Sequence, residues 1–457
     1  MSRKIRPYLI LILLISRLYS TAQSPTVYAF QQDDTLVRNN YLEEVASKKK
    51  LLLSGVPKAT ASDYKEIYES QFEEINDLVK TRSVTAPVAQ QYLQSMVKQV
   101  IAANPELAKL HTRIFFTRDW WPNAASMGEG TIGINAGLMV FLHNEAELVF
   151  VICHELGHYY RDHTQKSIDK YVETVNSAAF QAELKRLSKT EYGANKQLEA
   201  LSKGLAFNNR RHSRDNEAEA DRYAFAFMKK TGYDVGGIKS CLELLDKVDD
   251  SLLTTLKLEQ ALNFEQYPFK PKWIQKESAI FSQMSEDDNQ LSKKEKDSLK
   301  THPNCQQRIA FLADSINSIK TGKSFIVNEE LFNRLKKDFF REMTEQCYRK
   351  NNLSRNLYYS LLLLQDNSED QMAIYSVARC LNQLYESQKN HKLGLMIDLE
   401  GKEYPAQYNL LLRMLKRLRL DEIAAINQHF CKKYTAFMKD NPDFAKESTK
   451  AFQLTKS

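Results

Sequence analysis

The residues with the clearest chemical potential lie in the stretch VICHELGHYYRDHTQK, residues 151–166, where three histidines and a glutamate fall close together. The whole chain has only nine histidines, so this clustering is uncommon. His154, Glu155 and His158 form the pattern H-E-x-x-H. On a helix, His154 and His158 stand one turn apart on the same face and can bind one zinc ion together. Glu155 is then close enough to accept a proton from a water molecule that the metal activates.

A catalytic zinc site of this kind needs a third protein ligand. His163 follows His158 by five residues and points away from the shared helix face, so we expect it to cap or support rather than to bind metal. The stretch SRDNEAEAD offers better candidates, because Glu217 and Asp221 lie four residues apart on one helical face, with Glu219 on another. One of these two carboxylates can bind the metal while the other accepts the N–H of a metal-bound histidine and fixes its ring.

The elements that must position these residues are mainly helical. Glycine and proline are sparse, at 14 and 11 residues, and apolar positions recur at helical spacing over residues 41–110. Residues 113–117 read as a short strand, and residues 130–139 as a second strand that runs into a helix. Asn144 is a good N-cap for the helix that carries the H-E-x-x-H pattern. Residues 214–234 predict the helix of the carboxylates.

The N-terminal segment has the plan of a secretory signal peptide, with basic residues, an apolar run over residues 8–15 and small residues ending at Ala22. We expect cleavage after Ala22 and a mature protein that is periplasmic or secreted; a retained membrane anchor is the alternative. Without the four basic residues of this segment the net charge falls from +7 to +3, which gives no reason to expect nucleic-acid binding. No later segment is apolar enough to span a membrane.

The six cysteines have wide spacings and contain no C-x-x-C pair, so any disulfide connectivity cannot be read from the sequence. Cys153 precedes His154 in an apolar helical stretch. We predict that Cys153 is a buried free thiol.

Four motifs occur in the order found in one known family, over roughly residues 60–320. The sequence resembles the gluzincin zinc metallopeptidases of the CAAX prenyl protease, HtpX and BepA family. WWPNAASMGEGTIGINAGLM resembles the strand that edges the cleft, and LHNEAELVFVICHELGHYYRDH resembles the metal helix. SRDNEAEADRYA resembles the helix of the third ligand, and THPNCQQRI resembles the Thr-His-Pro segment followed by Arg-Ile. The many membrane spans of the prenyl protease are absent, so the periplasmic branch fits better.

The resemblance implies roles for six residues. One Zn²⁺ per chain would be bound by His154, His158 and Glu217, with Glu155 as the general base and Asp221 as a supporting carboxylate. His302 matches a family histidine that can face the active site. It either stabilises the transition state, or occupies the open metal position in a closed form, or is an ordinary loop residue before Pro303.

The implied fold is mainly α (α+β). A zincin-like metallopeptidase domain with a small sheet would span residues 23–322, and an α-helical C-terminal domain, tetratricopeptide-like or generic, would span 323–457. The implied function is a zinc endopeptidase that cleaves exported or misfolded proteins, with its substrate added as a strand beside residues 131–135. The alternative is a chaperone or binding module with a silenced zinc site. Partners are polypeptide substrates, and other proteins bound through the C-terminal helices.

Overall fold

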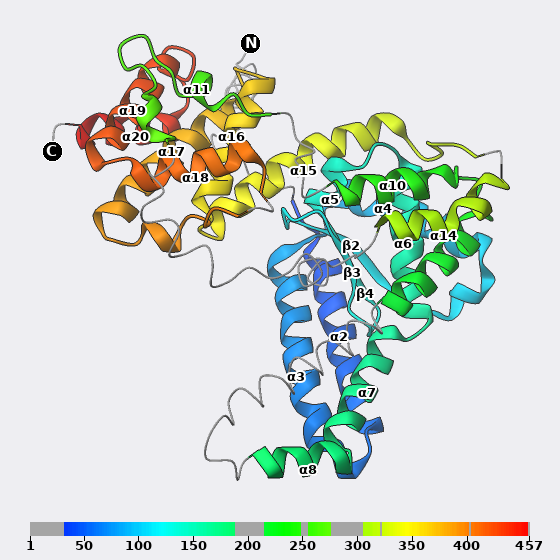
Figure 1. The fold of residues 1–457 in the computed structure, drawn as a ribbon. Coiled ribbons are helices and arrows are strands. Elements are labelled where there is room, and N and C mark those ends of the chain that lie inside the picture. Colours follow the sequence, from blue (N-terminus) through cyan, green and yellow to red (C-terminus); the bar gives the residue numbers. More distant parts are fainter. Residues whose placement is uncertain are drawn as a thin grey trace, which may run out of the picture.

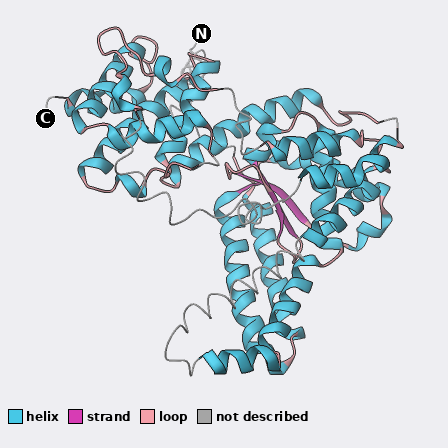
Figure 2. Ribbon diagram, in the orientation of Figure 1, coloured by secondary structure: helices cyan, strands magenta, loops and turns pink. Residues whose placement is uncertain are grey.

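The protein is mainly helical and contains one small sheet (Figure 2), as the sequence predicts. The computed structural model describes residues 32–187, 214–247, 255–275, 305–319, 322–401 and 404–455. The predicted signal peptide and His302 lie outside these residues. Among the described residues no helix combines the length and the apolar character that crossing a membrane requires.

The sheet has four short strands in the order β1-β2-β4-β3, which are β1 (Ser83–Val84), β2 (Arg113–Thr117), β4 (Thr131–Asn135) and β3 (Ala124–Ser126). β2 and β4 are parallel, and the two outer pairs are antiparallel. The predicted strand at 113–117 is confirmed, and so is the strand that runs into a helix over residues 130–139. The prediction that residues 131–135 receive a substrate strand is wrong, because β4 is paired on both sides. The outer strand next to β4 is β3.

The helix that carries the H-E-x-x-H pattern is α6 (Glu145–Tyr160), and every residue from Glu145 to Gly157 is buried. Its neighbours are α4 (Pro87–Ala103), α10 (Gly236–Asp246) and β3, with α5 (Ala136–Phe141) leading into it from β4. The predicted cap is confirmed, because the side chain of Asn144 accepts the N–H of Glu147 at 3.0 Å. Burial on all sides explains why the first three turns of α6 are so apolar.

A helical arm projects from the sheet (Figure 1). It consists of α2 (Thr35–Gly55), α3 (Ala61–Asp77), α7 (His163–Asn176) and α8 (Ala178–Leu187), with a π-helical turn, η2 (Leu78–Arg82), after α3. Its own apolar core joins residues of α2, α3 and α7 to Phe115 of β2. Because only two residues separate the end of α6 from the start of α7, the arm is continuous with the H-E-x-x-H helix.

The C-terminal helices form a separate lobe in Figure 1. They are α15 (Glu329–Arg349), α16 (Leu353–Asp366), α17 (Gln371–Lys389), α18 (Ala406–Arg417), α19 (Leu420–Tyr434) and α20 (Pro442–Leu454), with the short α11 (Leu258–Ala261) against α16 and α18. The predicted helical region is confirmed. The boundary at Gly322 and the tetratricopeptide-like character remain predictions.

Helix α15 joins this lobe to the sheet. It packs against both α5 and α16, and the rings of Phe116 in β2 and Phe339 in α15 are 4.7 Å apart. Arg118 donates to Glu342 of α15 at 2.6 Å. At the start of α15, the buried carboxylate of Glu145 accepts the backbone N–H of residues 326–328. The first helix of the lobe is therefore anchored to the N-terminus of the H-E-x-x-H helix.

Candidate metal centre

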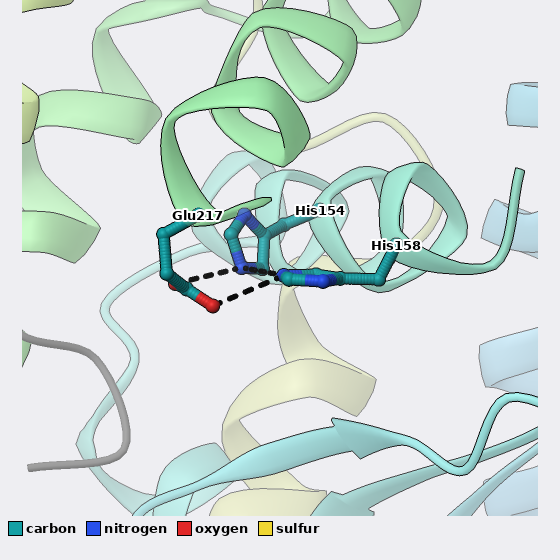
Figure 3. Close-up of side chains that lie close together, drawn as sticks. All are labelled: His154, His158 and Glu217. Carbon is teal, nitrogen blue, oxygen red and sulfur yellow. Dashed lines mark hydrogen bonds and ion pairs between the residues drawn. The ribbon is translucent and has the colours of Figure 1, made fainter. Parts of the chain in front are cut away.

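Three predicted metal ligands lie together in the structure (Figure 3). His154 and His158 are one turn apart on α6, and their Nε2 atoms are 3.1 Å apart. Glu217 comes from the helix over residues 214–228. Its Oε1 lies 3.2 Å from Nε2 of His158, and its Oε2 lies 3.5 Å from Nε2 of His154. Segments far apart in the sequence thus present three donor atoms to one point.

Gly157 permits the close approach that brings Glu217 to the histidines. A Cβ atom at this position would lie 3.1 Å from the backbone oxygen of Ala220 and 3.4 Å from Cβ of Tyr223. These are neighbours on the 214–228 helix, so any side chain at residue 157 would push that helix away. The glycine of the H-E-L-G-H stretch therefore helps to set the distance between the two ligand helices.

The donor set fits zinc in chemistry and in spacing. Catalytic zinc sites use three protein ligands of the imidazole and carboxylate type and keep one position open. Ligand atoms about 2.0–2.1 Å from a tetrahedral zinc stand about 3.3–3.4 Å from one another. The two Nε2 atoms are 3.1 Å apart, Oε1 of Glu217 lies 3.2 Å from that of His158 and Oε2 lies 3.5 Å from that of His154, so each pair of residues approaches to near that value. Only small side-chain adjustments are needed for these residues to hold one zinc ion.

Asp221 supports His154, and Arg308 supports Asp221. Oδ1 of Asp221 lies 3.0 Å from Nδ1 of His154, so this ring nitrogen donates and Nε2 is the nitrogen that faces the centre. Arg308 of α14 (Cys305–Asn317) donates to both carboxylate oxygens of Asp221 at 2.6 Å and lies 3.3 Å from Oε2 of Glu217. No role for Arg308 could be predicted from the sequence, because no short-range sequence pattern links it to Asp221.

The electrostatics of the centre favour a cation. Burial acts to raise the pKa of Asp221, but the adjacent Arg308 and His154 lower it to about 2. Burial likewise acts to lower the pKa of His154, but hydrogen bonds to Asp221 and Glu217 raise it to about 10. Two carboxylates that hold a proton on a buried imidazole this firmly also attract a metal cation to the same point.

His163 is not one of the three metal-ligand candidates, but its ring contacts the ring of His158 on the side away from the centre. Its Nδ1 lies 3.0 Å from Nδ1 of His158, on the side of that ring opposite to the centre. Its Nε2 lies 2.9 Å from Oε2 of Glu219, and Oε1 of the same carboxylate accepts from Arg161 at 2.9 Å. Burial lowers the pKa of His163, and the hydrogen bond to Glu219 opposes this shift. The sequence predicted a supporting place for His163 but gave no sign that Glu219 is its partner.

Glu155 is buried on α6 and lines a small pocket beside His154. Asn123 and Ala124 close the pocket on the β3 side, and Arg308 contributes to its polar wall. The pocket otherwise has apolar walls from α5, α6 and α10, namely Leu138, Phe150, Val151 and Leu245. Glu155 thus lies between the metal-ligand candidates and the outer strand of the sheet. His302 lies outside the described residues, so its placement stays a prediction.

Cys153 is a buried, free thiol, as predicted. Burial raises the pKa of the Cys153 thiol well above its ordinary value. The thiol is therefore protonated at neutral pH and is no candidate for a metal ligand.

A helical protein with a small mixed sheet and a buried His-His-Glu centre has the architecture of a gluzincin metallopeptidase. Comparison with known families agrees, because residues 87–316 match peptidase family M48. That match covers just over half of the 457 residues, and the chain belongs to this family. The resemblance described from the sequence is therefore confirmed.

Several known proteins are similar to parts of the chain. A Vibrio cholerae protein described as a putative beta-barrel assembly-enhancing protease is 24% identical over 157 residues, which are 34% of this chain and 32% of that protein. Metalloprotease YcaL of Escherichia coli is 29% identical over 157 residues, 34% of this chain and 58% of YcaL. Metalloprotease LoiP of the same organism is 25% identical over 211 residues, 44% of this chain and 78% of LoiP. The match thus spans about a third of the first relative and just over half of the second.

Proposed function

We propose that this chain is a zinc-dependent endopeptidase in which His154, His158 and Glu217 bind one zinc ion. The observation that carries the proposal is the spacing of their donor atoms, 3.1 to 3.5 Å, in a buried centre of a chain from peptidase family M48. When bound, zinc supplies a Lewis acid that polarises the scissile carbonyl and lowers the pKa of the attacking water to about 7.

Glu155 is the proposed general base. It follows His154 directly on α6, and its side chain lines the pocket beside the ligands. Glu155 accepts a proton from the water as the water oxygen bonds to the carbonyl carbon. It then delivers that proton to the nitrogen of the leaving amine as the carbon–nitrogen bond breaks. His154 and Asp221 stay in place throughout, because Arg308 holds the carboxylate of Asp221 from its far side.

We further propose that the substrate is an extended polypeptide that pairs with β3. β3 is the edge strand of the sheet and pairs with β4. Ala124, at the start of β3, lines the pocket that contains Glu155. A chain added to β3 by backbone hydrogen bonds would pass directly over the metal centre. The pocket between β3 and α6 would then receive one small substrate side chain next to the scissile bond.

The cellular setting completes the proposal. Residues 1–22 have the pattern of a signal peptide, which supports export and a periplasmic or secreted enzyme. Exported or misfolded proteins are the substrates that such a location offers. The helices from α15 to α20 supply a surface for binding other proteins. His302 is proposed to act at the open metal position.

The proposal is tested by measuring zinc content and casein hydrolysis for the wild type, Glu155→Gln and a control, Glu183→Gln. Glu183 lies on α8 of the arm and is exposed. We expect the wild type and the control to contain one zinc ion and to cleave casein. Glu155→Gln should keep its zinc and lose nearly all hydrolysis, because the ligands remain and the proton acceptor is gone. Zinc binding without hydrolysis by the wild type would instead support the chaperone or binding module.

A further inference from the structure

A chain of polar contacts runs from the second histidine of the metal centre to the protein surface. Nδ1 of His158 lies 3.0 Å from Nδ1 of His163, and Nε2 of His163 lies 2.9 Å from Oε2 of Glu219. Arg161 donates to Oε1 of the same carboxylate at 2.9 Å. His163 is only 3% exposed, so its two ring nitrogens have no better partner in water.

In the zinc-bound protein, where Nε2 of His158 carries no proton, the direction of each hydrogen bond in this chain follows from Glu219 at its outer end. A carboxylate only accepts, so Nε2 of His163 must carry a proton and donate to Glu219. The neutral ring of His163 then has its lone pair on Nδ1, which can only accept. Nδ1 of His158 must therefore donate to His163. Its remaining nitrogen, Nε2, faces Glu217 at 3.2 Å and the metal centre, and a bound zinc ion would take the place of any proton there.

We propose that His163 is a positioning residue that fixes the tautomer and the ring orientation of His158 for metal binding, with Glu219 as its acceptor. The inference rests on the proposed function, in which His158 binds zinc. His163 would orient the ring of His158 as Asp221 orients the ring of His154. The partner of His158 is a histidine, whereas the partner of His154 is a carboxylate. Partners of this kind raise the affinity of a site for its metal, because they disfavour tautomers and ring orientations of the metal-free histidine that cannot bind it.

The backbone around His163 is built to hold its ring in this position. Asp162 has φ 53°, a left-handed conformation that turns the chain sharply between α6 and α7. That turn directs the first residue of α7 back against the last turn of α6. Helix α7 is held against α3 of the same arm, because the hydroxyl groups of Tyr68 and Tyr64 on α3 donate to Gln165 and Asp169 of α7 at 2.9 Å. The ring is thus fixed from both sides.

The test compares zinc dissociation constants for three variants by competition with a chromophoric chelator. His163→Leu removes the acceptor and keeps similar bulk, and should weaken zinc binding by about 10–100-fold. His163→Asn puts an amide oxygen where Nδ1 stands, so it should restore affinity to within a few-fold of the wild type. Thr174→Val is the matched control, since it loses one hydrogen bond on the same helix, to the backbone oxygen of Lys170, without contacting His163 or His158. It should bind zinc like the wild type.

The outcomes separate this proposal from the general one. A wild-type protein that binds no zinc would defeat the proposed function itself. Zinc binding by the wild type that His154→Ala abolishes but His163→Leu leaves unchanged would overturn only the positioning role. Equal losses in His163→Leu and His163→Asn would also overturn it, because the shape of the ring rather than the acceptor would then matter.

A spectroscopic measurement covers the case in which His163→Leu fails to fold. In the zinc-loaded wild type with ¹⁵N-labelled histidine, long-range ¹H–¹⁵N spectra should show His158 protonated at Nδ1, and His163 protonated at Nε2. A His158 ring that carries its proton at Nε2, or a His163 ring protonated at both nitrogens, would contradict the proposal.

Discussion

Replacing Asp221 by asparagine tests how the metal centre is supported. The carboxylate is fully buried, accepts one N–H from His154 at 3.0 Å and accepts two from Arg308 at 2.6 Å. The introduced asparagine would keep the shape of the side chain, lose its charge and turn one acceptor into a donor. If the new N–H group faces Arg308, two donors meet. If it faces His154, that ring must accept at Nδ1 and carry its proton at Nε2, where the metal should bind.

Two effects with separate magnitudes follow from Asp221→Asn. Loss of the partner of a metal-bound histidine costs about 10–100-fold in zinc affinity. The zinc-free protein also loses stability, because the lowering of the Asp221 pKa from 3.8 to about 2 corresponds to about 2–3 kcal/mol. A depressed carboxylate pKa stabilises the fold above about pH 4, and this contribution disappears as the pH falls towards about 2. At neutral pH the full effect of the substitution should be seen.

Chelator competition measures the zinc affinity, and urea unfolding of the zinc-free protein measures the stability. Asp246→Asn is a matched control, since Asp246 accepts one hydrogen bond from Gln306 at an exposed position. In a double-mutant cycle, Arg308→Gln should lessen the cost of Asp221→Asn, because it removes the donor that the asparagine cannot satisfy. Wild-type zinc affinity and stability in Asp221→Asn, or strict additivity in the cycle, would refute the reasoning.

Three further predictions concern the same centre. Glu217→Ala removes one of three ligands and should sharply lower the zinc content found by metal analysis, whereas Glu243→Ala on the exposed side of α10 should not. Gly157→Val should cost about 1–3 kcal/mol in urea unfolding. It should also weaken zinc binding, because even its Cβ would press on the backbone of Ala220 at 3.1 Å; an unchanged unfolding curve would contradict the close packing. His302→Ala should leave zinc unchanged, raising basal proteolysis if His302 silences the enzyme and lowering it if His302 stabilises the transition state. Unaltered proteolysis would leave His302 an ordinary loop residue.

The local chemistry of the centre could be predicted from the sequence because it depends on spacing along one helix. A four-residue separation places His154 and His158 on one face of any α-helix, whatever surrounds it. The apolar run that follows Asn144 marked that helix as buried, and the strands at 113–117 and 130–135 were visible as short β-rich runs. These features depend only on the spacing of residues that are close in the sequence, so they can be predicted from the sequence alone.

The partners across the fold were decided by tertiary structure alone. Arg308 meets Asp221, and Glu219 meets His163, over separations of 87 and 56 residues, and no local pattern encodes either contact. Sheet order is a second example. β4 looked like the strand that borders the substrate, but β3 pairs with its free side and takes the outer position. Hydrogen-bonding capacity is the same for every strand, so the packing of the whole domain determines which strand is left at the edge.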